Sequence, residues 1–291
     1  MLTAASVIVN SDAADAASAV ERWALLSDCH IDASLATVSR QGVNMADNFK
    51  RVLNEVLAER DQLDGVIING DCAYLEGLAG DYATLATLLA PVREAGLAVH
   101  FTLGNHDDRA KFLEAFAGNE PRPVDGKQVS VVQGRCANWV FLDSLRFVNK
   151  VEGEFGPEQL QWLSGYLEAQ TAKPVILVGH HYPQAFRDDI IPSADKIQIA
   201  GLIDGDAFLK LANGFPHAKA YIYGHSHDWR VTPGGADLHQ INLPPTAYVF
   251  SPARPNGWVR ATVKPGGMTL ELRALDPAHP EHGKPVELAW R

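Results

Sequence analysis

Residues 23–30 read Trp-Ala-Leu-Leu-Ser-Asp-Cys-His, an apolar run that ends at the polar group Asp28-Cys-His30. A short apolar run of this kind is typical of a buried strand. In open α/β sheets, ligands bind at the carboxyl ends of the strands, which is where this acid and this histidine lie. The stretch therefore predicts an α/β protein with a site at the end of its first strand.

Apolar runs that end in polar residues recur along the first two thirds of the chain, separated by segments with helical periodicity. Further strands are predicted over residues 65–69, 98–103, 129–132, 139–142, 174–178 and 220–223. Helices are predicted over residues 45–59, 82–95 and 157–170. The strands predicted over residues 129–132 and 139–142 should form a hairpin through Gly134. Pro157 suits the first turn of the helix predicted over residues 157–170.

The chain changes character after His227, where short apolar runs are separated by Pro and Gly and no helical pattern continues to Arg291. We predict an antiparallel, β-rich tail there. Alternating βα units followed by such a tail favour a two-sheet α/β sandwich with helices outside. A chain of 291 residues is compatible with one α/β domain. We therefore predict an N-terminal extension over residues 1–20 and a single domain over residues 21–291.

Composition excludes several classes of partner. The formal net charge of -10 and the lack of a Lys/Arg-rich run argue against a nucleic acid polymer as substrate. A small phosphate ester is compatible with this charge, since bound divalent cations reverse the local potential. No apolar run is long enough to span a bilayer, and three cysteines are too few for a disulfide-stapled secreted domain. We expect no membrane partner, and the compartment stays open between cytoplasm and periplasm.

Each of five predicted strands ends at residues that can bind a metal. These blocks are Asp28-Cys-His30, Gly70-Asp71, Gly104-Asn-His-Asp107, Gly179-His-His181 and Gly224-His-Ser-His227. One such block alone is more often a turn or a helix cap, but five at strand ends together indicate a site. Oxygen and nitrogen ligands without thiolate suit Mn, Fe, Zn, Co or Ni. Two such ions about 3.5 to 4 Å apart can clamp a displacement at phosphorus, with a metal-bound hydroxide as nucleophile.

Spacing within the blocks indicates how ligands could be shared. Asp28 and His30 stand two residues apart, so an extended chain directs both side chains to one side and Cys29 to the other. Asp71 supplies two oxygens that could bridge two cations, and Gly70 permits the tight turn that delivers it.

The ordered combination of these blocks resembles the calcineurin-like metallophosphoesterase family and covers about the first four fifths of the chain. The resemblance implies a four-layer α/β/β/α sandwich of two mixed sheets flanked by helices. It implies two transition-metal ions, such as Mn, Fe or Zn, the first of them held by Asp28, His30, Asp71 and His227. The second is implied to be held by Asp71, Asn105, His180 and His225. Asp71 would then bridge both ions.

The resemblance also implies catalytic roles near Asn105. Asn105 and His106 would contact substrate, and His106 would stabilise the transition state or protonate the leaving oxygen. Asp107 would orient His106 or a neighbouring ligand. Asp107 also suits the N-cap of a helix over residues 109–116, and both roles can coexist.

The fourth block contains two adjacent histidines. Alignment on Gly179 or on the double histidine favours His180 as the ligand, whereas alignment on Pro183 favours His181. We take His180 as the ligand and His181 as a residue that lines the cavity and contacts substrate.

The compact arrangement is most similar to bacterial cyclic-nucleotide and glycerophosphodiester phosphodiesterases, which implies hydrolysis of small diesters. The alternative is a phosphomonoesterase, because Gly179-His-His-Tyr-Pro183 lies between the motifs of the two groups. A binding module without catalysis should have lost ligands, and none is missing. Residues 184–216 separate the fourth and fifth blocks and are expected to pass over the site.

Two further features have alternative interpretations. Cys29 and Cys72 could form a redox pair, but two small buried packing residues are the simpler interpretation. Tyr248-Val-Phe250 could pair with a second subunit in a homo-oligomer, and internal packing explains it equally well.

Overall fold

The computed structural model of the chain describes residues 19–116, 122–184 and 200–290. Residues 1–18 of the predicted N-terminal extension lie outside the described residues, and the first strand begins at Glu21. The domain boundary therefore stays a prediction. Residues 185–199, within the segment expected to pass over the site, also lie outside the described residues.

Strands and helices alternate in the first part of the chain, as the sequence predicts. The strands are β1 (Glu21–Ser27), β2 (Gly65–Asn69), β3 (Val99–Thr102), β4 (Ser130–Gln133), β5 (Asn138–Phe141), β6 (Val175–Val178), β7 (Ala218–Tyr223), β8 (Arg230–Thr232), β9 (His239–Asn242), β10 (Gly257–Lys264), β11 (Gly267–Ala274) and β12 (Pro285–Ala289). The helices are α2 (Met45–Ala58), the 3-10 turn η1 (Arg60–Gln62), α3 (Ala79–Glu94), α4 (Arg109–Phe116), α5 (Pro157–Ala169) and α6 (Gly205–Asn213). Pro157 occupies the first turn of α5, where its missing N–H costs no hydrogen bond.

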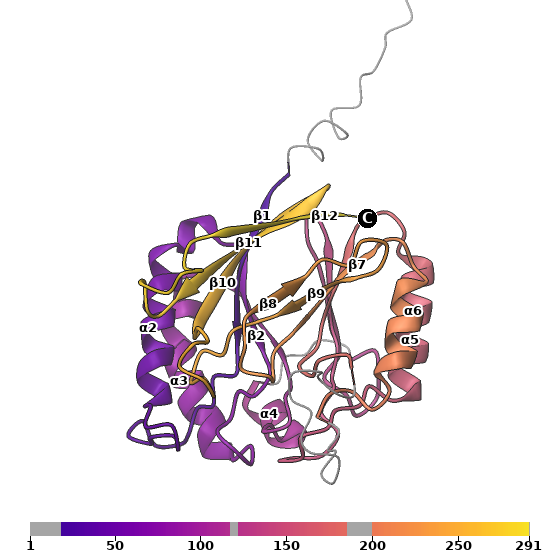
Figure 1. Cartoon of the computed structure of the whole chain (residues 1–291). Helices are drawn as coiled ribbons and strands as arrows, with labels where there is room; N and C mark the ends of the chain where they lie inside the picture. The colour runs from indigo at the N-terminus through magenta and orange to yellow at the C-terminus, as the bar shows by residue number, and fades with distance from the viewer. Residues whose placement is uncertain (1–18, 117–121, 185–199, 291) are drawn as a thin grey trace, which may run out of the picture.

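The strands form two six-stranded mixed sheets. The first has the order β12-β11-β10-β1-β2-β3, with β1, β2 and β3 parallel and the C-terminal strands antiparallel. The second has the order β4-β5-β6-β7-β9-β8, with a parallel centre and the antiparallel strands β4 and β8 at its edges. Figure 1 shows α2 and α3 on one side of the two sheets and α5 and α6 on the other. The predicted four-layer α/β/β/α sandwich is confirmed.

Three hydrophobic clusters hold the layers together. Along β1, Leu25 packs between the two sheets, whereas Leu26 packs on the outer face beneath α2 and α3. Successive strand side chains point to opposite faces, so a continuous apolar run is what a strand buried on both faces requires. The outer face of the second sheet packs against α5 and α6, where Phe208 of α6 lies against Phe155 and Tyr221.

The structure corrects two features of the sequence prediction. The tail after His227 is not wholly antiparallel, because β9 pairs in parallel with β7 on one side and antiparallel with β8 on the other. The tail also divides between the sheets, since β10, β11 and β12 complete the first one. Helix α6 was not predicted, although Phe208 and Ala212 recur at helical spacing on its buried side. Strand order depends on contacts between distant segments, which local periodicity does not report.

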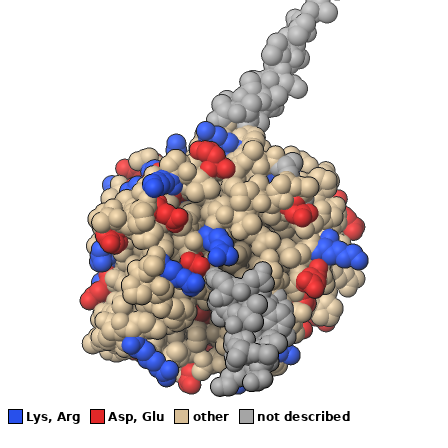
Figure 2. Space-filling model, in the orientation of Figure 1, with Lys and Arg blue, Asp and Glu red and all other residues tan. Residues whose placement is uncertain are grey.

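Blue and red residues are interspersed on the face shown in Figure 2, without a continuous basic patch. None of the helices in the described ranges has the length and apolar character needed to cross a membrane.

Candidate metal centre

Strand register places the ligand blocks next to one another. Ser27, Asn69 and Thr102 end β1, β2 and β3, and they are neighbouring Cα partners across the first sheet. In the second sheet, Val178 of β6 pairs with Ile222 of β7. The blocks that follow these strands therefore leave at one end of the sandwich, as the sequence predicts for a ligand site.

Five of the seven predicted metal ligands have a left-handed backbone. Their φ angles are 52° at Asp28, 47° at His30, 46° at Asp71, 66° at His225 and 50° at His227. Asn149 is the only other non-glycine in the described ranges with positive φ. Each such residue costs on the order of 1–3 kcal/mol. The extended chain that we assumed at Asp28 and His30 is therefore wrong, because both lie in sharp turns after β1.

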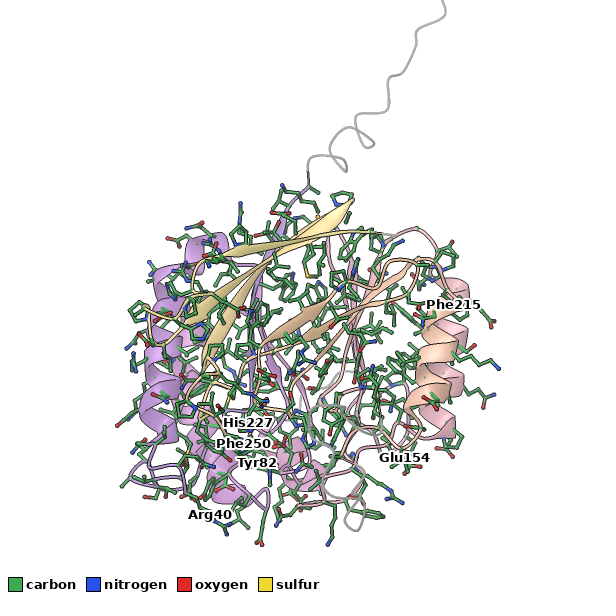
Figure 3. All side chains as sticks on the ribbon, in the orientation of Figure 1. Arg40, Tyr82, Glu154, Phe215, His227 and Phe250 are labelled. Carbon is green, nitrogen blue, oxygen red and sulfur yellow. The ribbon has the colours of Figure 1, made fainter. Side chains whose placement is uncertain are left out.

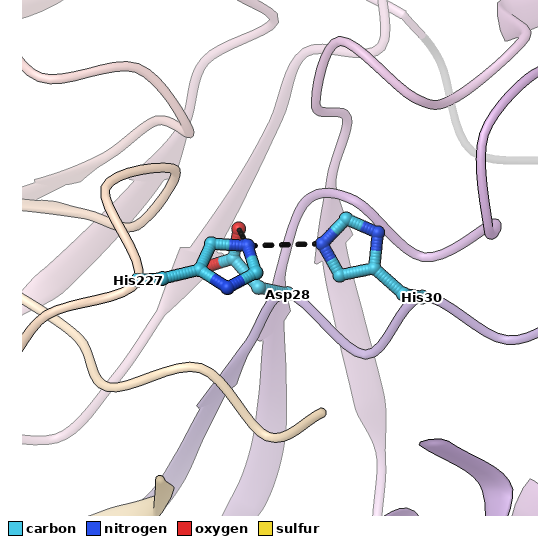
Figure 4. A group of neighbouring side chains, drawn as sticks. All are labelled: Asp28, His30 and His227. Carbon is cyan, nitrogen blue, oxygen red and sulfur yellow. Dashed lines mark hydrogen bonds and ion pairs between the residues drawn. The ribbon is translucent and has the colours of Figure 1, made fainter. Parts of the chain in front are cut away.

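The first group of candidate ligands consists of Asp28, His30 and His227, all buried (Figure 4). His227 Nε2 lies 3.1 Å from His30 Nε2 and 3.5 Å from Asp28 Oδ1. The three ligand atoms lie within 4.8 Å of one another, so a single ion could contact all of them. Residues 28, 30 and 227 thus come together as the sequence predicts.

The second group consists of Asp71, His180 and His225, again with ligand atoms within 4.8 Å of one another. Three buried atoms here have no hydrogen-bond partner, namely Asn105 Oδ1, His180 Nε2 and His225 Nδ1. Leaving one such atom unpaired costs about 1–3 kcal/mol, and coordination to a cation would satisfy all three. The predicted second ligand set fits an ion on this observation.

Asp71 lies between the two groups. Its Oδ2 atom is 3.7 Å from His30 Nε2 and 3.3 Å from His180 Nε2. Its Oδ1 atom accepts a hydrogen bond of 2.9 Å from the backbone N–H of His106. The carboxylate is therefore held in place and faces a histidine of each group, as a bridging ligand must.

Four histidines of the site are oriented by backbone carbonyls. The pairs are His30 Nδ1 with Tyr74 O at 3.1 Å, His180 Nδ1 with Asn69 O at 2.9 Å, His227 Nδ1 with Tyr248 O at 2.6 Å, and His225 Nε2 with Ala200 O at 2.8 Å. A carbonyl can only accept, so each ring carries its proton on this outer nitrogen. In a neutral ring the inner nitrogen then presents a lone pair, which is the form that binds metal.

The charges of these groups depend on burial and on one another. Burial lowers the pKa of His30 and His227 to about 4, so these rings are neutral at pH 7. Burial also lowers the pKa of His225, to about 3. For His180, burial acts in the same direction, but the charges of Asp71 and Asp28 outweigh it and raise the pKa to about 9. Two buried carboxylates thus require a positive charge, which a proton on His180 or a bound cation supplies.

Asp107 lies behind the ligand loops rather than at a helix cap. Its buried carboxylate accepts hydrogen bonds from the backbone N–H groups of Cys72, Ala73 and Gly104 and from the Tyr82 hydroxyl. The N-cap position before α4 is filled instead by Asp108, whose carboxylate accepts from Lys111 N. The N-cap reading of Asp107 is therefore wrong, and its contacts fit a residue that fixes the loops carrying Asp71 and Asn105.

His181 is fully buried beside the site, and it does not line the cavity. Its Nδ1 atom lies 2.7 Å from Ser144 Oγ, and its ring packs against that of His225 with centroids 4.6 Å apart. His180, in contrast, lies among the ligand atoms. The geometry favours His180 as the ligand, and it places His181 behind His225 rather than against a substrate.

Cys29 and Cys72 are free, buried thiols in the core beneath α2 and α3. Burial raises the pKa of both thiols well above the ordinary value, so they are protonated and unreactive at neutral pH. Their surroundings agree with a packing role.

The two ligand groups open into a cavity of about 510 Å³. Besides ligands and His106, its walls include Val151, Tyr182, Tyr248, Phe250 and Arg254. From the sequence alone, Tyr248 and Phe250 are expected only to pack internally or to contact a second subunit. Their place follows from the loop between β9 and β10 returning to the site, which no local pattern indicates.

Comparisons with known proteins agree with this geometry. Residues 22–229 match the family described as calcineurin-like phosphoesterase. The 3′,5′-cyclic adenosine monophosphate phosphodiesterase CpdA of Vibrio vulnificus is 26% identical over 252 residues, which cover 86% of this chain and 84% of that protein. The glycerophosphodiester phosphodiesterase GpdQ of Enterobacter lignolyticus is 25% identical over 187 residues, 62% of each chain.

Solved structures show the same fold. A dimetal phosphatase from Danio rerio superposes with a TM-score of 0.67 at 15% identity, covering 93% of this chain and 99% of that one. A purple acid phosphatase from yellow lupin seeds also gives 0.67, at 12% identity, with 94% of this chain and 54% of that chain covered.

Proposed function

This chain belongs to the calcineurin-like phosphoesterase family and is a phosphoric ester hydrolase, and we propose that it hydrolyses small phosphodiesters at a centre of two transition-metal ions. Substrates of the cyclic-nucleotide or glycerophosphodiester type fit the names of the similar proteins.

The arrangement of the four oriented histidines carries the proposal. Each donates its outer N–H to a carbonyl, so the neutral rings of His30, His225 and His227 present inner lone pairs toward the buried carboxylates. The fourth ring, His180, faces Asp71 at 3.3 Å and supplies the positive charge there when no ion is bound. Lone pairs and carboxylates repel one another in a buried site. A cation bound between them is attracted to both, which removes the unfavourable interaction. Such an arrangement costs stability without ions, and it is explained by a role in holding them.

The residues divide between two ions. We assign Asp28, His30, Asp71 and His227 to the first, and Asp71, Asn105, His180 and His225 to the second. When bound, the ions supply charge stabilisation at phosphorus and lower the pKa of water, so that a nucleophile forms at neutral pH. Their identity is open among Mn, Fe and Zn.

His106 is the candidate acid. It lines the cavity, and its Nδ1 atom lies 2.9 Å from the Leu75 carbonyl, which fixes the proton on that nitrogen. The Nε2 atom is then free to contact a phosphate oxygen and, when protonated, to give its proton to the leaving oxygen. Asp107 acts indirectly, by holding the backbone of the ligand loops.

Charge in the cavity favours diesters over monoesters. Arg254 is the only Lys or Arg among the described residues of the cavity wall, and it pairs with Asp228 at 3.5 Å. A monoester carries more negative charge at neutral pH and requires more cationic contacts than a diester. A phosphomonoesterase remains the alternative, based on the double histidine before Tyr182-Pro183.

Turnover of chromogenic esters tests the proposal. Protein loaded with Mn should hydrolyse bis(p-nitrophenyl) phosphate faster than p-nitrophenyl phosphate and contain two ions per chain by mass spectrometry. Asp71→Ala and Asn105→Ala should each lower kcat by at least about 100-fold. Asp61→Ala is the matched control, because the Asp61 side chain is 89% exposed. Unchanged turnover in both site variants would exclude the dinuclear mechanism, and faster turnover of the monoester would favour the alternative.

A further inference from the structure

Phe250 is the most exposed of the large apolar side chains in the described part of the chain, at 61% of its full surface. It lies on the wall of the cavity beside the metal centre. Figure 3 labels Phe250 and His227 at the same end of the molecule. Single exposed apolar side chains are common on protein surfaces, but this one lies on the wall of the candidate substrate cavity, where a ligand can cover it.

Phe250 stacks on one of the candidate metal ligands. Its ring lies nearly parallel to that of His227, with centroids 4.5 Å apart and an interplanar angle of 29°. His227 is fixed in turn by its hydrogen bond to the Tyr248 carbonyl. Tyr248 meets Phe250 edge to face at 5.9 Å and stacks on His30 at 5.1 Å. These contacts place one face of the Phe250 ring against His227 and its edge region near Tyr248.

The wall around Phe250 suits a flat, largely apolar group. Val151, Tyr182 and Tyr248 contribute apolar or aromatic surface to the same cavity. Ser251 supplies a hydroxyl next to Phe250 that could bond to the polar edge of such a group. An aliphatic alcohol such as glycerol would bring hydroxyls to this wall and gain no stacking from the ring.

We propose that Phe250 is the platform on which this site stacks the base of a nucleotide, and that it thereby selects nucleoside-containing diesters over aliphatic ones. The inference rests on the proposed phosphodiesterase function. Base-aromatic stacking contributes to binding with little dependence on base identity, because every base has a π face. Phe250 therefore sets the class of substrate rather than the choice among bases.

The position of the ring relative to the ligands supports this division of roles. His227 lies between Phe250 and Asp28, so a base stacked at the ring belongs to a molecule whose phosphate can reach the carboxylate–histidine groups. A contact at the base is made equally in the ground state and in the transition state. Its loss should raise KM and leave kcat unchanged.

Kinetics with two diesters test the proposal. The substrates are 3′,5′-cyclic adenosine monophosphate, which has a base, and glycerophosphoethanolamine, which has none. Phe250→Ala should raise KM for the cyclic nucleotide about tenfold and retain its kcat, while the KM of the aliphatic diester changes less than about twofold. Phe250→Leu should raise the KM for the cyclic nucleotide as the alanine variant does, because it lacks an aromatic ring. Phe250→Trp should keep this KM close to the wild-type value.

Phe147→Ala is the matched control, because Phe147 is 58% exposed and lies outside the cavity. It should leave both KM values unchanged, and thermal unfolding should show that all variants are folded. An equal rise of KM for both diesters, or a normal KM in Phe250→Ala, would overturn the stacking role while the phosphodiesterase activity stands. Absence of turnover with both diesters and with bis(p-nitrophenyl) phosphate would instead overturn the proposed function.

Discussion

The Nε2 atoms of His30 and His227 lie 3.1 Å apart, although both rings direct their Nδ1 protons to backbone carbonyls. Two neutral rings in these tautomers face each other with lone pairs, which form no hydrogen bond. The contact is unfavourable in the protein alone and favourable around a cation. The geometry of this pair therefore links metal binding to stability.

Metal binding should stabilise the fold. Adding Mn or Zn to protein stripped with a chelator, at about 100 times Kd, should raise the free energy of unfolding by about 3 kcal/mol and Tm by at least about 5 °C. His227→Ala should reduce this shift, because it removes a ligand of the first ion. Differential scanning calorimetry measures both. A Tm that stays unchanged after addition of each of Mn, Fe, Co, Ni and Zn would contradict the assignment of these residues as metal ligands.

The two adjacent histidines should differ in metal stoichiometry. His180→Gln should lose about one ion per chain, because His180 Nε2 lies among the ligand atoms. His181→Gln should retain both ions, since His181 is held against Ser144 behind His225. Mass spectrometry of the purified variants decides the point, and the reverse result would make His181 the ligand.

Asp107→Ala should weaken metal binding without removing a ligand. The substitution leaves the buried N–H groups of Cys72, Ala73 and Gly104 without an acceptor, at about 1–3 kcal/mol for each. Stability should fall by several kcal/mol, and Kd for the metal should rise about 10- to 100-fold.

Asp108→Ala provides the comparison for Asp107. It removes a helix N-cap, so it should cost about 1 kcal/mol with metal affinity unchanged. Chemical denaturation and metal titration measure the two effects. Equal metal affinities in the two variants would show that Asp107 has no positioning role.

Gly104→Ala should abolish occupancy of the second site. A Cβ atom at this position would overlap Asp71 Oδ1 and would lie 2.7 Å from His180 Nε2. Both partners are fixed, so the ligands themselves must move. Gly165→Ala in α5 is the control, because nothing lies within 4 Å of its Cβ position, and it should be neutral or slightly stabilising. Two bound ions in Gly104→Ala would refute the steric prediction.

Much of the site could be predicted because it consists of strand ends. The apolar run before Asp28 and the run before Asp71 fix both the strands and the positions at which they end. Parallel pairing of Ser27 with Asn69 then brings the two blocks together with no further information. These apolar runs can be recognised within each segment alone, because a strand that is buried on both faces needs apolar residues at successive positions.

Other parts depend on long-range contacts that a single sequence does not display. Nothing near Asp107 indicates that Tyr82 and the loop after Asp71 supply its hydrogen-bond donors. Pairing of β9 with β7 is likewise decided by which strand edge is available after the second sheet forms. The predicted domain limits and the individual ligand roles stay predictions.

The pattern of the sequence alone predicts the alternation of strands and helices, and it supplies the candidate ligand residues in their order along the chain. Only the tertiary structure decided the left-handed turns at Asp28 and His30, the choice of inner nitrogen on each ring, and the place of Phe250 at the cavity. Residue type and periodicity are properties of a single segment, so they can be recognised without knowing which segments come together in the fold. Backbone strain, tautomers and cavity walls arise where segments distant in the sequence meet, because the packed fold supplies the energy and the partners that fix them.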